Sequence, residues 1–516
     1  MKTDHTIIRR VSAAIAAIVA GVALTACTAA TTTTTGTTNT ITGSTAAATS
    51  ASAAELLADN VESHADSNDA DYDASGATTI TLAEGASKTN SSDGVTIDGD
   101  TITITAPGTY ILSGTLSNGQ VVVNSTDDGK VKLVLDDASI TNTSGSALVV
   151  TESDETVLIL AAGSSNSITD GTGYDTSADD APNAALYSAD DLTIGGTGSL
   201  TVTGNTNDGI TSKDGLVILS GTVTVTAVDD GIRGKDYLIV EGGTITVTAQ
   251  GDGLKSDNED DDTVGYILVN DGTVEISAGD DGMDADGDLA ISGGTVTIAQ
   301  SEEGLEGSNV LVIGGEISVT ANDDGLNATQ GSTTDTGQGG GGGGMGDDGS
   351  LLSISGGSLT VDAGGDGLDS NGALEVSGGT TVVYGPTNNG NGALDSNGGI
   401  TVTGGTLLAG GSAGMAETPG TDSSEGWVAV TFDSQVSAGQ TVTIVKDGET
   451  IATYTATKQI GSLVVADPSI TTGESYEVQV DGSTVSTVTA GEGASSGMGG
   501  GGMGGGPGGG GPGGRG

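Results

Sequence analysis

Cysteine, histidine and basic residues are scarce in this chain. Its 516 residues include one Cys, two His and 13 Lys or Arg. A single cysteine leaves no internal disulfide, so stability must come from hydrogen bonding, packing and any bound ion. His5 and His64 lie near the N-terminus, which argues against a Ser-His-Asp triad or a histidine-built metal site elsewhere. No G-x-x-x-x-G-K-[ST] motif is present, so the glycine-rich segments are not phosphate-binding loops.

Aromatic residues and positive charge are also in short supply. Aromatics are 2% of the residues, so a buried core has to be built from Ile, Val and Leu. The formal net charge is 13 − 69 = −56. Such a charge opposes binding to nucleic acid or to an anionic membrane face, and binding of any polyanion would require bridging cations. Sustained V-T-V-T and I-T-V-T alternation predicts strands rather than disorder.

What the chain does contain is a repeat of about 22 residues, D-D-G-[ILM]-x-x-x-x-x-[IL]-x-[IV]-x-G-G-T-[IV]-T-[IV]-x-A. Its first glycine, here called the marker glycine, recurs at Gly209, Gly231, Gly253, Gly282, Gly304, Gly325, Gly367 and Gly392. A fixed period in this range indicates stacked supersecondary units. Each unit holds short β-rich runs and no helical stretch. The repeat therefore predicts an all-β solenoid, a parallel β-helix in which each coil pairs with its neighbours.

The N-terminus carries a targeting signal, assigned to residues 1–27. A basic start precedes the 13-residue apolar segment Val11–Ala23, which is too short to span a bilayer. Leu24–Cys27 then looks like a bacterial lipobox, which predicts lipidation of Cys27 and an extracellular protein anchored to the cell membrane by lipid alone. The alternative is an ordinary secretory signal with an incidental cysteine.

Composition divides the rest of the chain into four parts. Residues 28–75 read as a Thr/Ala/Ser-rich stalk followed by an acidic linker. Residues 76–412 hold the predicted β-helix, with irregular early coils as expected at the end of a solenoid. Residues 425–490 have strand patterns without the repeat and form a small C-terminal β unit or cap. Residues 491–516 are a Gly-rich tail that we expect to be disordered.

The sequence resembles a known family in four places. These are residues 101–123 (TITITAPGTYILSGTLSNGQVVV), residues 130–142 (KVKLVLDDASITN), residues 182–202 (PNAALYSADDLTIGGTGSLTV) and the D-D-G-I coils that follow. Together they resemble a bacterial carbohydrate-binding family of secreted right-handed parallel β-helices, described as binding cellulose and acid sugars. The resemblance covers residues 70–411. It implies a fold similar to that of pectate lyases, and bound calcium.

One column of the aligned repeats is almost entirely acidic. Coils of a β-helix stack about 4.8 Å apart, and like charges at that spacing repel by roughly 1–3 kcal/mol per pair. Ca²⁺, which takes six to eight oxygen ligands, would relieve that repulsion. The alternative is that Asp-Asp-Gly simply makes the turn. The predicted metal ligands are Asp229, Asp230, Asp252, Asp280, Asp281, Asp284, Asp286, Glu302, Glu303, Glu306, Asp323 and Asp324. Asp288 belongs to the same patch, and the loop of Asp257 and residues 259–262 is a second candidate.

Between Leu133 and Val445 the chain has only four basic residues, all just after marker glycines of consecutive coils. We predict that they bind substrate: Lys213, Arg233, Lys235 and Lys255. A cationic patch beside an acidic stripe suits uronic acid sugars. The alternative is that these cations balance neighbouring aspartates. The repeats also lack aromatic stacking platforms for neutral glucans, which favours acidic polysaccharide over cellulose.

These observations predict a non-catalytic binder of pectin-like polyuronate, and possibly of cellulose, that uses Ca²⁺ and acts as a monomer. One alternative is a Ca²⁺-dependent pectate lyase, in which Arg233 and Lys255 would be the catalytic bases. Another is a structural surface protein or adhesin with no sugar ligand. Release of unsaturated uronide separates the enzyme from the binder, and a glycan array separates the binder from the structural protein.

Overall fold

The structure, a computed structural model, describes residues 56–178, 181–259, 263–330 and 346–493. The chain consists of two compact units, residues 1–38 and residues 39–516, and the first unit lies outside the described ranges. So do the predicted signal segment, Cys27, most of the stalk and nearly all of the Gly-rich tail. The described residues are all-β apart from a few short turns such as the 3₁₀ turn η1 (Ala74–Gly76). Among them, we find no helix with the length and hydropathy needed to cross a membrane.

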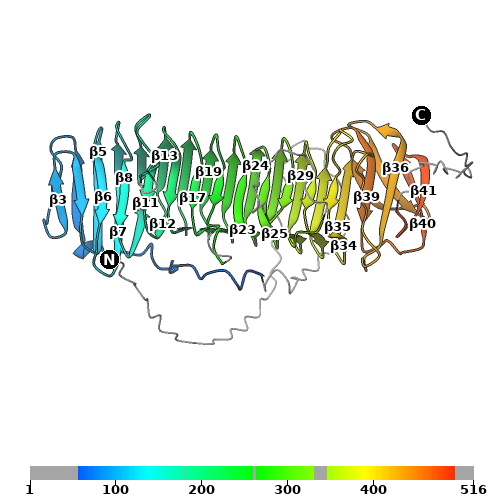
Figure 1. The fold of residues 1–516 in the computed structure, drawn as a ribbon, viewed down its shortest axis with the longest axis horizontal. Helices are drawn as coiled ribbons and strands as arrows, with labels where there is room; N and C mark the ends of the chain where they lie inside the picture. The colour runs from blue at the N-terminus through cyan, green and yellow to red at the C-terminus, as the bar shows by residue number, and fades with distance from the viewer. Residues whose placement is uncertain (1–55, 179–180, 260–262, 331–345, 494–516) are drawn as a thin grey trace, which may run out of the picture. The chain divides into compact units, whose positions relative to one another are not determined.

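Most strands belong to one 37-stranded, mostly parallel sheet in which each strand pairs with the strand one repeat further along (Figure 1). The pairings form three columns, and a coil is the stretch that gives one strand to each column. The first column contains β4 (Thr101–Ile104), β6 (Gln120–Asn124), β8 (Leu148–Glu152), β11 (Ala184–Ser188), β14 (Asp208–Ser212), β17 (Ile232–Gly234), β20 (Leu254–Ser256), the first halves of β23 (Met283–Ile291) and β25 (Leu305–Val312), β27 (Leu326–Ala328), β30 (Leu368–Ser370) and β33 (Leu394–Ser396).

The other two columns follow the same order. The second contains β1 (Thr78–Ala83), β5 (Gly108–Leu116), β7 (Lys130–Thr141), β9 (Glu155–Leu160), β12 (Leu192–Gly196), β15 (Gly215–Ile218), β18 (Tyr237–Val240), β21 (Tyr266–Val269), the second halves of β23 and β25, β28 (Leu351–Ile354), β31 (Ala373–Val376) and β34 (Gly399–Val402). The third contains the ends of β5 and β7, β10 (Ser165–Thr169), β13 (Ser199–Gly204), β16 (Thr222–Ala227), β19 (Thr244–Thr248), β22 (Thr273–Ser277), β24 (Thr295–Gln300), β26 (Glu316–Ala321), β29 (Ser358–Ala363), β32 (Thr380–Tyr384) and β35 (Thr406–Gly411).

The two ends of the stack use antiparallel pairing. At the start, β2 (Lys88–Thr89) pairs with β1, and β3 (Val95–Asp98) pairs with β4. At the other end, β39 (Ile460–Ala466) pairs with both β35 and β36 (Trp427–Val436). A separate four-stranded sheet follows, made of β38 (Glu449–Thr455), β37 (Thr441–Lys446), β40 (Ser475–Val480) and β41 (Ser483–Thr489). The antiparallel strands therefore cover the last coil, where a parallel edge would otherwise be open.

The core between the columns is aliphatic, as the low aromatic content predicts. In β16, Val223 and Val225 are buried while Thr222, Thr224 and Thr226 are exposed, so this third-column strand has one solvent face. The second column differs, because all four residues of β15 and of β18 are buried. Both faces of these second-column strands are covered.

The cover on the second column is the segment of residues 56–73, here called the strap (Figure 1). Leu56 packs near Leu311, and Val61 packs near Tyr237 and Tyr266. The sequence predicts an acidic linker here, whereas the structure places this part of the segment against the strands. The polar composition of the strap conceals this packing, since few of its side chains are apolar and those few make the apolar contacts with the strands.

The marker glycines are required for space rather than for a turn conformation. A Cβ on Gly231 would lie 2.2 Å from Val247 Cγ1 and 2.6 Å from the carbonyl oxygen of Gly253 on the next coil. Its φ is not in the left-handed region, whereas Gly243, in the Gly-Gly-Thr of the same coil, has φ +96°. The Asp-Asp-Gly sequence thus allows close approach of successive coils, and Gly-Gly-Thr makes the left-handed turn.

Candidate functional site

The acidic residues that precede the marker glycines form a ladder along the first column. The backbone N–H of Asp252 donates to Asp230 Oδ1 at 3.0 Å, that of Asp281 to Asp252 Oδ1 at 2.9 Å, and that of Glu303 to Asp281 Oδ1 at 3.0 Å. Each carboxylate therefore satisfies a backbone donor of the next coil. This is a structural role that uses one oxygen of each carboxylate, and the second oxygen of Asp252 pairs with Lys255.

Two ladder residues, Asp281 and Glu303, form a group of three carboxylates with Glu306, which lies two residues after the marker glycine Gly304. One oxygen from each lies within 4.8 Å of the others, and Asp252, Asp280 and Asp281 form a second group of this kind. Asn327 donates Nδ2–H to Glu303 Oε2 at 2.9 Å, while its own buried Oδ1 has no hydrogen-bond partner among the described residues. A cluster of carboxylate oxygens beside an unpaired amide oxygen is a donor set that Ca²⁺ accepts.

The electrostatics of the ladder favour uptake of positive charge. Burial, followed by repulsion from neighbouring carboxylates, raises the pKa of both Glu306 and Asp281 above the ordinary range. Asp369, two residues after the marker glycine Gly367, has a pKa raised to about 8 by the same causes. At Asp324 burial and neighbouring carboxylates outweigh a backbone hydrogen bond, and its pKa rises to about 7. These carboxyl groups hold protons near neutral pH unless a cation replaces the protons.

The remaining predicted ligands occupy different surroundings. Asp229, Asp280, Glu302 and Asp323 are exposed at the outer edge of the turns. The buried Oδ2 of Asp286 has no hydrogen-bond partner among the described residues. Asp288 lies on the second column, where Asn309 and the strap residue Asn60 donate to its two oxygens at 2.8 and 3.0 Å. Asp288 therefore does not belong with the cluster at Asp281.

The repeat alignment places Thr211, Arg233, Lys255, Asp284 and Glu306 in one row, and the strand register has the same order. Arg233 donates from Nε to Asp257 Oδ1 at 2.9 Å and also pairs with the other oxygen of Asp257. Lys255 pairs with Asp252, and with Asp284 Oδ2 at 2.9 Å. Two of the four predicted substrate-binding cations are thus engaged by carboxylates of the protein.

The other two cations, Lys213 and Lys235, have no ion pair with any described residue. They follow Ser212 and Gly234, which pair directly between adjacent coils, so their strands are about 4.8 Å apart. Burial and the nearby charge of Arg233 lower the pKa of Lys213. An anionic ligand would relieve that repulsion. Of the predicted acidic loop, Asp257 is held by Arg233, and residues 260–262 lie outside the described ranges.

Neither predicted lyase base is set up to accept a proton. Burial lowers the pKa of Lys255, but Asp284 and Asp252 outweigh burial and raise that pKa above its ordinary value. Burial likewise opposes the charge of Arg233, and the carboxylate of Asp257 raises its pKa overall. A general base must lose its proton near the working pH. Both side chains are instead held in the charged form.

Comparison with known proteins relates this part of the chain to carbohydrate binding. Residues 98–349 match the family model described as carbohydrate-binding domain-containing protein. A curated carbohydrate-binding domain-containing protein of Acetivibrio thermocellus is 39% identical over 137 residues, which are 26% of this chain and 48% of that protein. The chain thus spans about half the length of this relative. The matched residues 98–349 include the ladder from Asp208 to Asp324 and all four cations.

Among solved structures, the chain is similar to one described as a polysaccharide lyase-like protein from C. thermocellum, in a gadolinium derivative. The sequence identity is 32%, and the alignment covers 49% of this chain and 97% of that one, with a TM-score of 0.41.

Proposed function

We propose that this protein binds acidic polysaccharide of the polyuronate class without cleaving it. The observation that carries the proposal is the match to a carbohydrate-binding family over the coils that also hold the four cations and the acidic ladder. In a chain of net charge −56, a polyuronate is repelled at long range, and salt screens that repulsion beyond about 8 Å. Binding then depends on local positive charge.

Lys213 and Lys235 supply that charge in this proposal. They stand on adjacent coils and have no carboxylate partner among the described residues, so their ammonium groups can bind sugar carboxylates. Arg233 and Lys255 are held by Asp257, Asp252 and Asp284 and define the edge of the patch. This narrows the predicted set of four cations to two that contact the ligand.

Ca²⁺ is the second source of positive charge. The carboxylates of Asp281, Glu303 and Glu306 would hold it, because one oxygen of each lies within 4.8 Å of the others, and the neighbouring Asn327 has an amide oxygen without a described partner. A bound Ca²⁺ would neutralise the ladder and offer open positions to sugar carboxylates. The protein residues orient the ion, and the ladder hydrogen bonds fix the carboxylates of Asp281 and of its neighbours.

The finer features of the proposal follow from the sequence. The stacked columns are taken as a right-handed parallel β-helix, by the resemblance described above. Lipidation at Cys27 would anchor the protein to the outer face of the bacterial cell membrane, with the stalk as a spacer. The protein would act as a monomer.

Isothermal titration with polygalacturonate tests the proposal. We expect the Lys213→Ala/Lys235→Ala variant to lose about a hundredfold or more in affinity, because each of the two lost charge-assisted contacts removes about 1.5–3 kcal/mol. The control is Lys88→Ala, which removes an exposed cation on β2, outside the site. EDTA, which removes Ca²⁺, should also weaken binding of polygalacturonate by the wild type. Unchanged affinity in the double variant would show that the ligand lies elsewhere, and absorbance from unsaturated uronide would show a lyase.

A further inference from the structure

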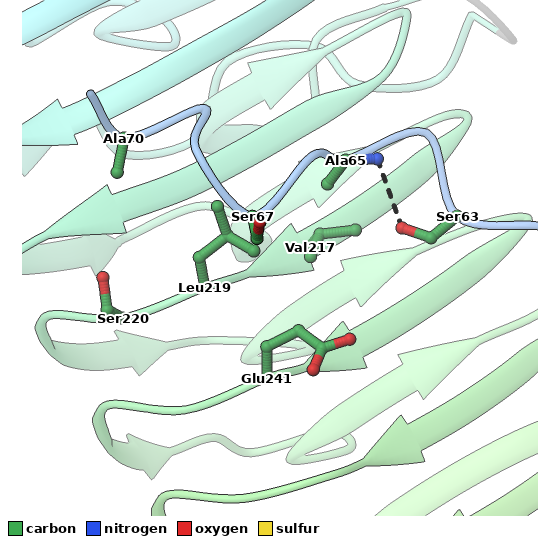
Figure 2. A pocket seen from close by; sticks show the side chains of 8 residues that line it. All are labelled: Ser63, Ala65, Ser67, Ala70, Val217, Leu219, Ser220 and Glu241. Atoms are coloured by element: carbon green, nitrogen blue, oxygen red, sulfur yellow. Dashed lines mark hydrogen bonds between the residues drawn. The ribbon is translucent and has the colours of Figure 1, made fainter. Parts of the chain in front are cut away.

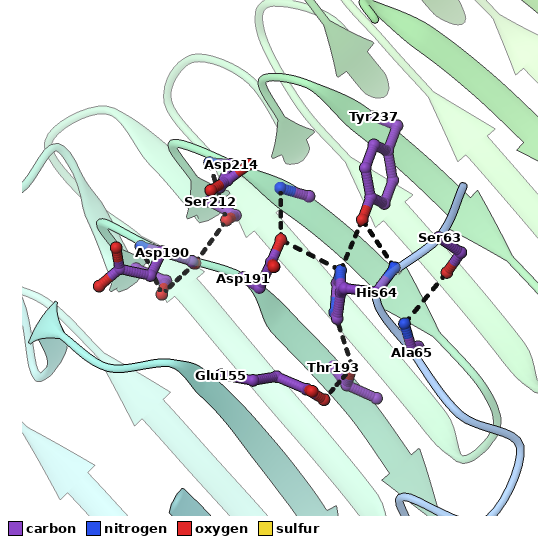
Figure 3. Close-up of polar contacts among 12 residues, drawn as sticks. Ser63, His64, Ala65, Glu155, Asp190, Asp191, Thr193, Ser212, Asp214 and Tyr237 are labelled. Atoms are coloured by element: carbon purple, nitrogen blue, oxygen red, sulfur yellow. Dashed lines mark hydrogen bonds and ion pairs between the residues drawn. The ribbon is translucent and has the colours of Figure 1, made fainter. Parts of the chain in front are cut away.

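The strap is fixed to the second column by His64 (Figure 3). The backbone N–H of His64 donates to the Tyr237 hydroxyl at 2.9 Å, and its ring Nδ1 pairs with the same hydroxyl at 2.8 Å and with Asp191 Oδ1 at 3.1 Å. Ring Nε2 pairs with Thr193 Oγ1 at 2.9 Å. The side chain is only 9% exposed. This buried, multiply bonded ring holds the neighbouring strap residues in a defined position.

A second anchor lies five residues further along the strap. Lys130 Nζ pairs with Asp69 Oδ1 at 2.7 Å and with Glu155 at 2.6 Å. Lys132 Nζ donates to the backbone carbonyls of Asp69 and Asp71, at 2.8 Å each. The strap between His64 and Asp69 is therefore held at both ends.

Between these anchors the strap and the columns enclose a cleft of about 370 Å³ (Figure 2). Its lining residues come in equal numbers from the strap and from the columns: Ser63, Ala65, Ser67, Ala70, Val217, Leu219, Ser220 and Glu241. The volume falls within the about 300–1,000 Å³ that is usual for small-ligand sites. Because both walls are anchored, the cleft is formed before any ligand arrives.

The chemistry of the cleft is amphipathic and contains no positive charge. Leu219 gives it a half-buried apolar floor, Val217 lies beneath and is only 1% exposed, and serine hydroxyls stand along its sides. Glu241 is the one charged lining residue, and one of its oxygens accepts from Asn270 Nδ2 at 3.1 Å. The other Glu241 oxygen and the Ser67 hydroxyl have no hydrogen bond with described residues. A carboxylate without a cation disfavours anionic ligands, so the uronates of the cation patch do not fit here.

We propose that this cleft binds one neutral pyranose unit, with the apolar face of the sugar ring on Leu219, above the buried Val217. Ring hydroxyls donate to Glu241 and exchange hydrogen bonds with Ser63 and Ser67. The proposal rests on the proposed function for its ligand class, carbohydrate, but it places a site for uncharged sugar on a different column from the uronate site. The strap thereby becomes half of a binding site.

The test is titration of the full chain, labelled with ¹³C at Val and Leu methyl groups, with cellotetraose, xylotetraose and mannotetraose. All titrations are run in EDTA, so they do not depend on bound Ca²⁺. We expect the methyl signals of Val217 and Leu219 to shift with at least one of these sugars. Ser67→Phe, which fills the cleft from an exposed strap position, should weaken that binding at least tenfold. Ser437→Phe, an exposed position in the C-terminal unit, is the matched control.

Three results would overturn the proposal. They are the absence of methyl shifts with all three sugars at millimolar concentration, the same shifts in Ser67→Phe, and the same affinity in Glu241→Gln, which keeps the shape of the side chain and removes its charge. Polygalacturonate binding measured on the same Ser67→Phe variant should be unchanged. Tetrasaccharide shifts in the wild type, together with no polygalacturonate binding by the wild type, would count against the proposed function and leave the cleft proposal standing.

Discussion

Replacing Asp281 by Asn and Glu306 by Gln together should stabilise the protein in the absence of Ca²⁺ and remove most of the stabilisation that Ca²⁺ gives. The two carboxylates and Glu303 place oxygens within 4.8 Å of one another. Above about pH 8, where all three groups are charged, each pair of charges at this distance repels by roughly 1–3 kcal/mol for effective dielectric constants of 80 down to 20. In the double variant both side chains keep their size and an oxygen acceptor, and only Glu303 of the three residues keeps its charge. Without a cation, we therefore expect it to be more stable than the wild type.

Ca²⁺ should reverse that order. A ligand that binds only the folded state adds about 2.7 kcal/mol at a hundredfold excess over its Kd. The wild type should gain this increment, which raises the melting temperature by a few degrees for a chain of this size. The variant should gain little, because the donor set has lost two of its three charges. The two melting temperatures should thus approach or cross as Ca²⁺ is added.

Differential scanning calorimetry in EDTA and in excess CaCl₂ measures both effects. The matched control is Asp271→Asn with Glu275→Gln, which removes the same charge from exposed positions on a neighbouring coil. The control should keep the full response to Ca²⁺. A wild type with the same melting curve in EDTA and CaCl₂, or a double variant that keeps the response, would refute the assignment of Ca²⁺ to this cluster.

Three further predictions concern the pH response, the strap and the membrane anchor. The pKa values of Asp324 and Asp369 are raised to about 7 and about 8, so the folded state binds protons that the unfolded state releases. Stability in EDTA should therefore increase as pH falls from about 8 towards 5. A urea midpoint that falls over this pH range would contradict this prediction. His64→Ala removes one of the two anchors of the strap, so hydrogen exchange over residues 56–73 should be faster than in the wild type while the columns stay protected. An exchange rate equal to that of the wild type would mean that the Lys130 anchor suffices. Cys27→Ser should release the protein from the membrane fraction, and retention there would exclude the lipid anchor.

The rows of the candidate site could be predicted from sequence because the repeat fixes the length of each coil. Once Gly209, Gly231 and Gly253 align, the residues two positions later must stack, and Thr211, Arg233 and Lys255 do pair in this order. The partners of the long side chains could not be predicted in this way. Arg233 contacts Asp257, in the insertion within the next coil, because a long flexible side chain selects its partner in three dimensions.

The strap left a signal in the sequence that alternation alone does not capture. Third-column strands such as Thr222–Ala227 alternate, because one face meets water, whereas the runs at Tyr237–Val240 and Tyr266–Val269 are continuously apolar. A strand that is apolar on both faces has to be covered twice. The column interior covers one face, so a further segment had to cover the other.

The outward face of the second column changes close to the coils that Leu56 contacts. In the second column, Glu375 of β31 and Thr401 of β34 occupy the register position of Ser353 in β28, so the outward face becomes polar there. The described strap begins at Leu56, which packs in one cluster with Ala290, Leu311 and Leu351, just before that change. The outward apolar residues of the second column therefore mark the coils against which the described part of the strap packs, even though the acidic, serine-rich strap shows little of this in its own composition.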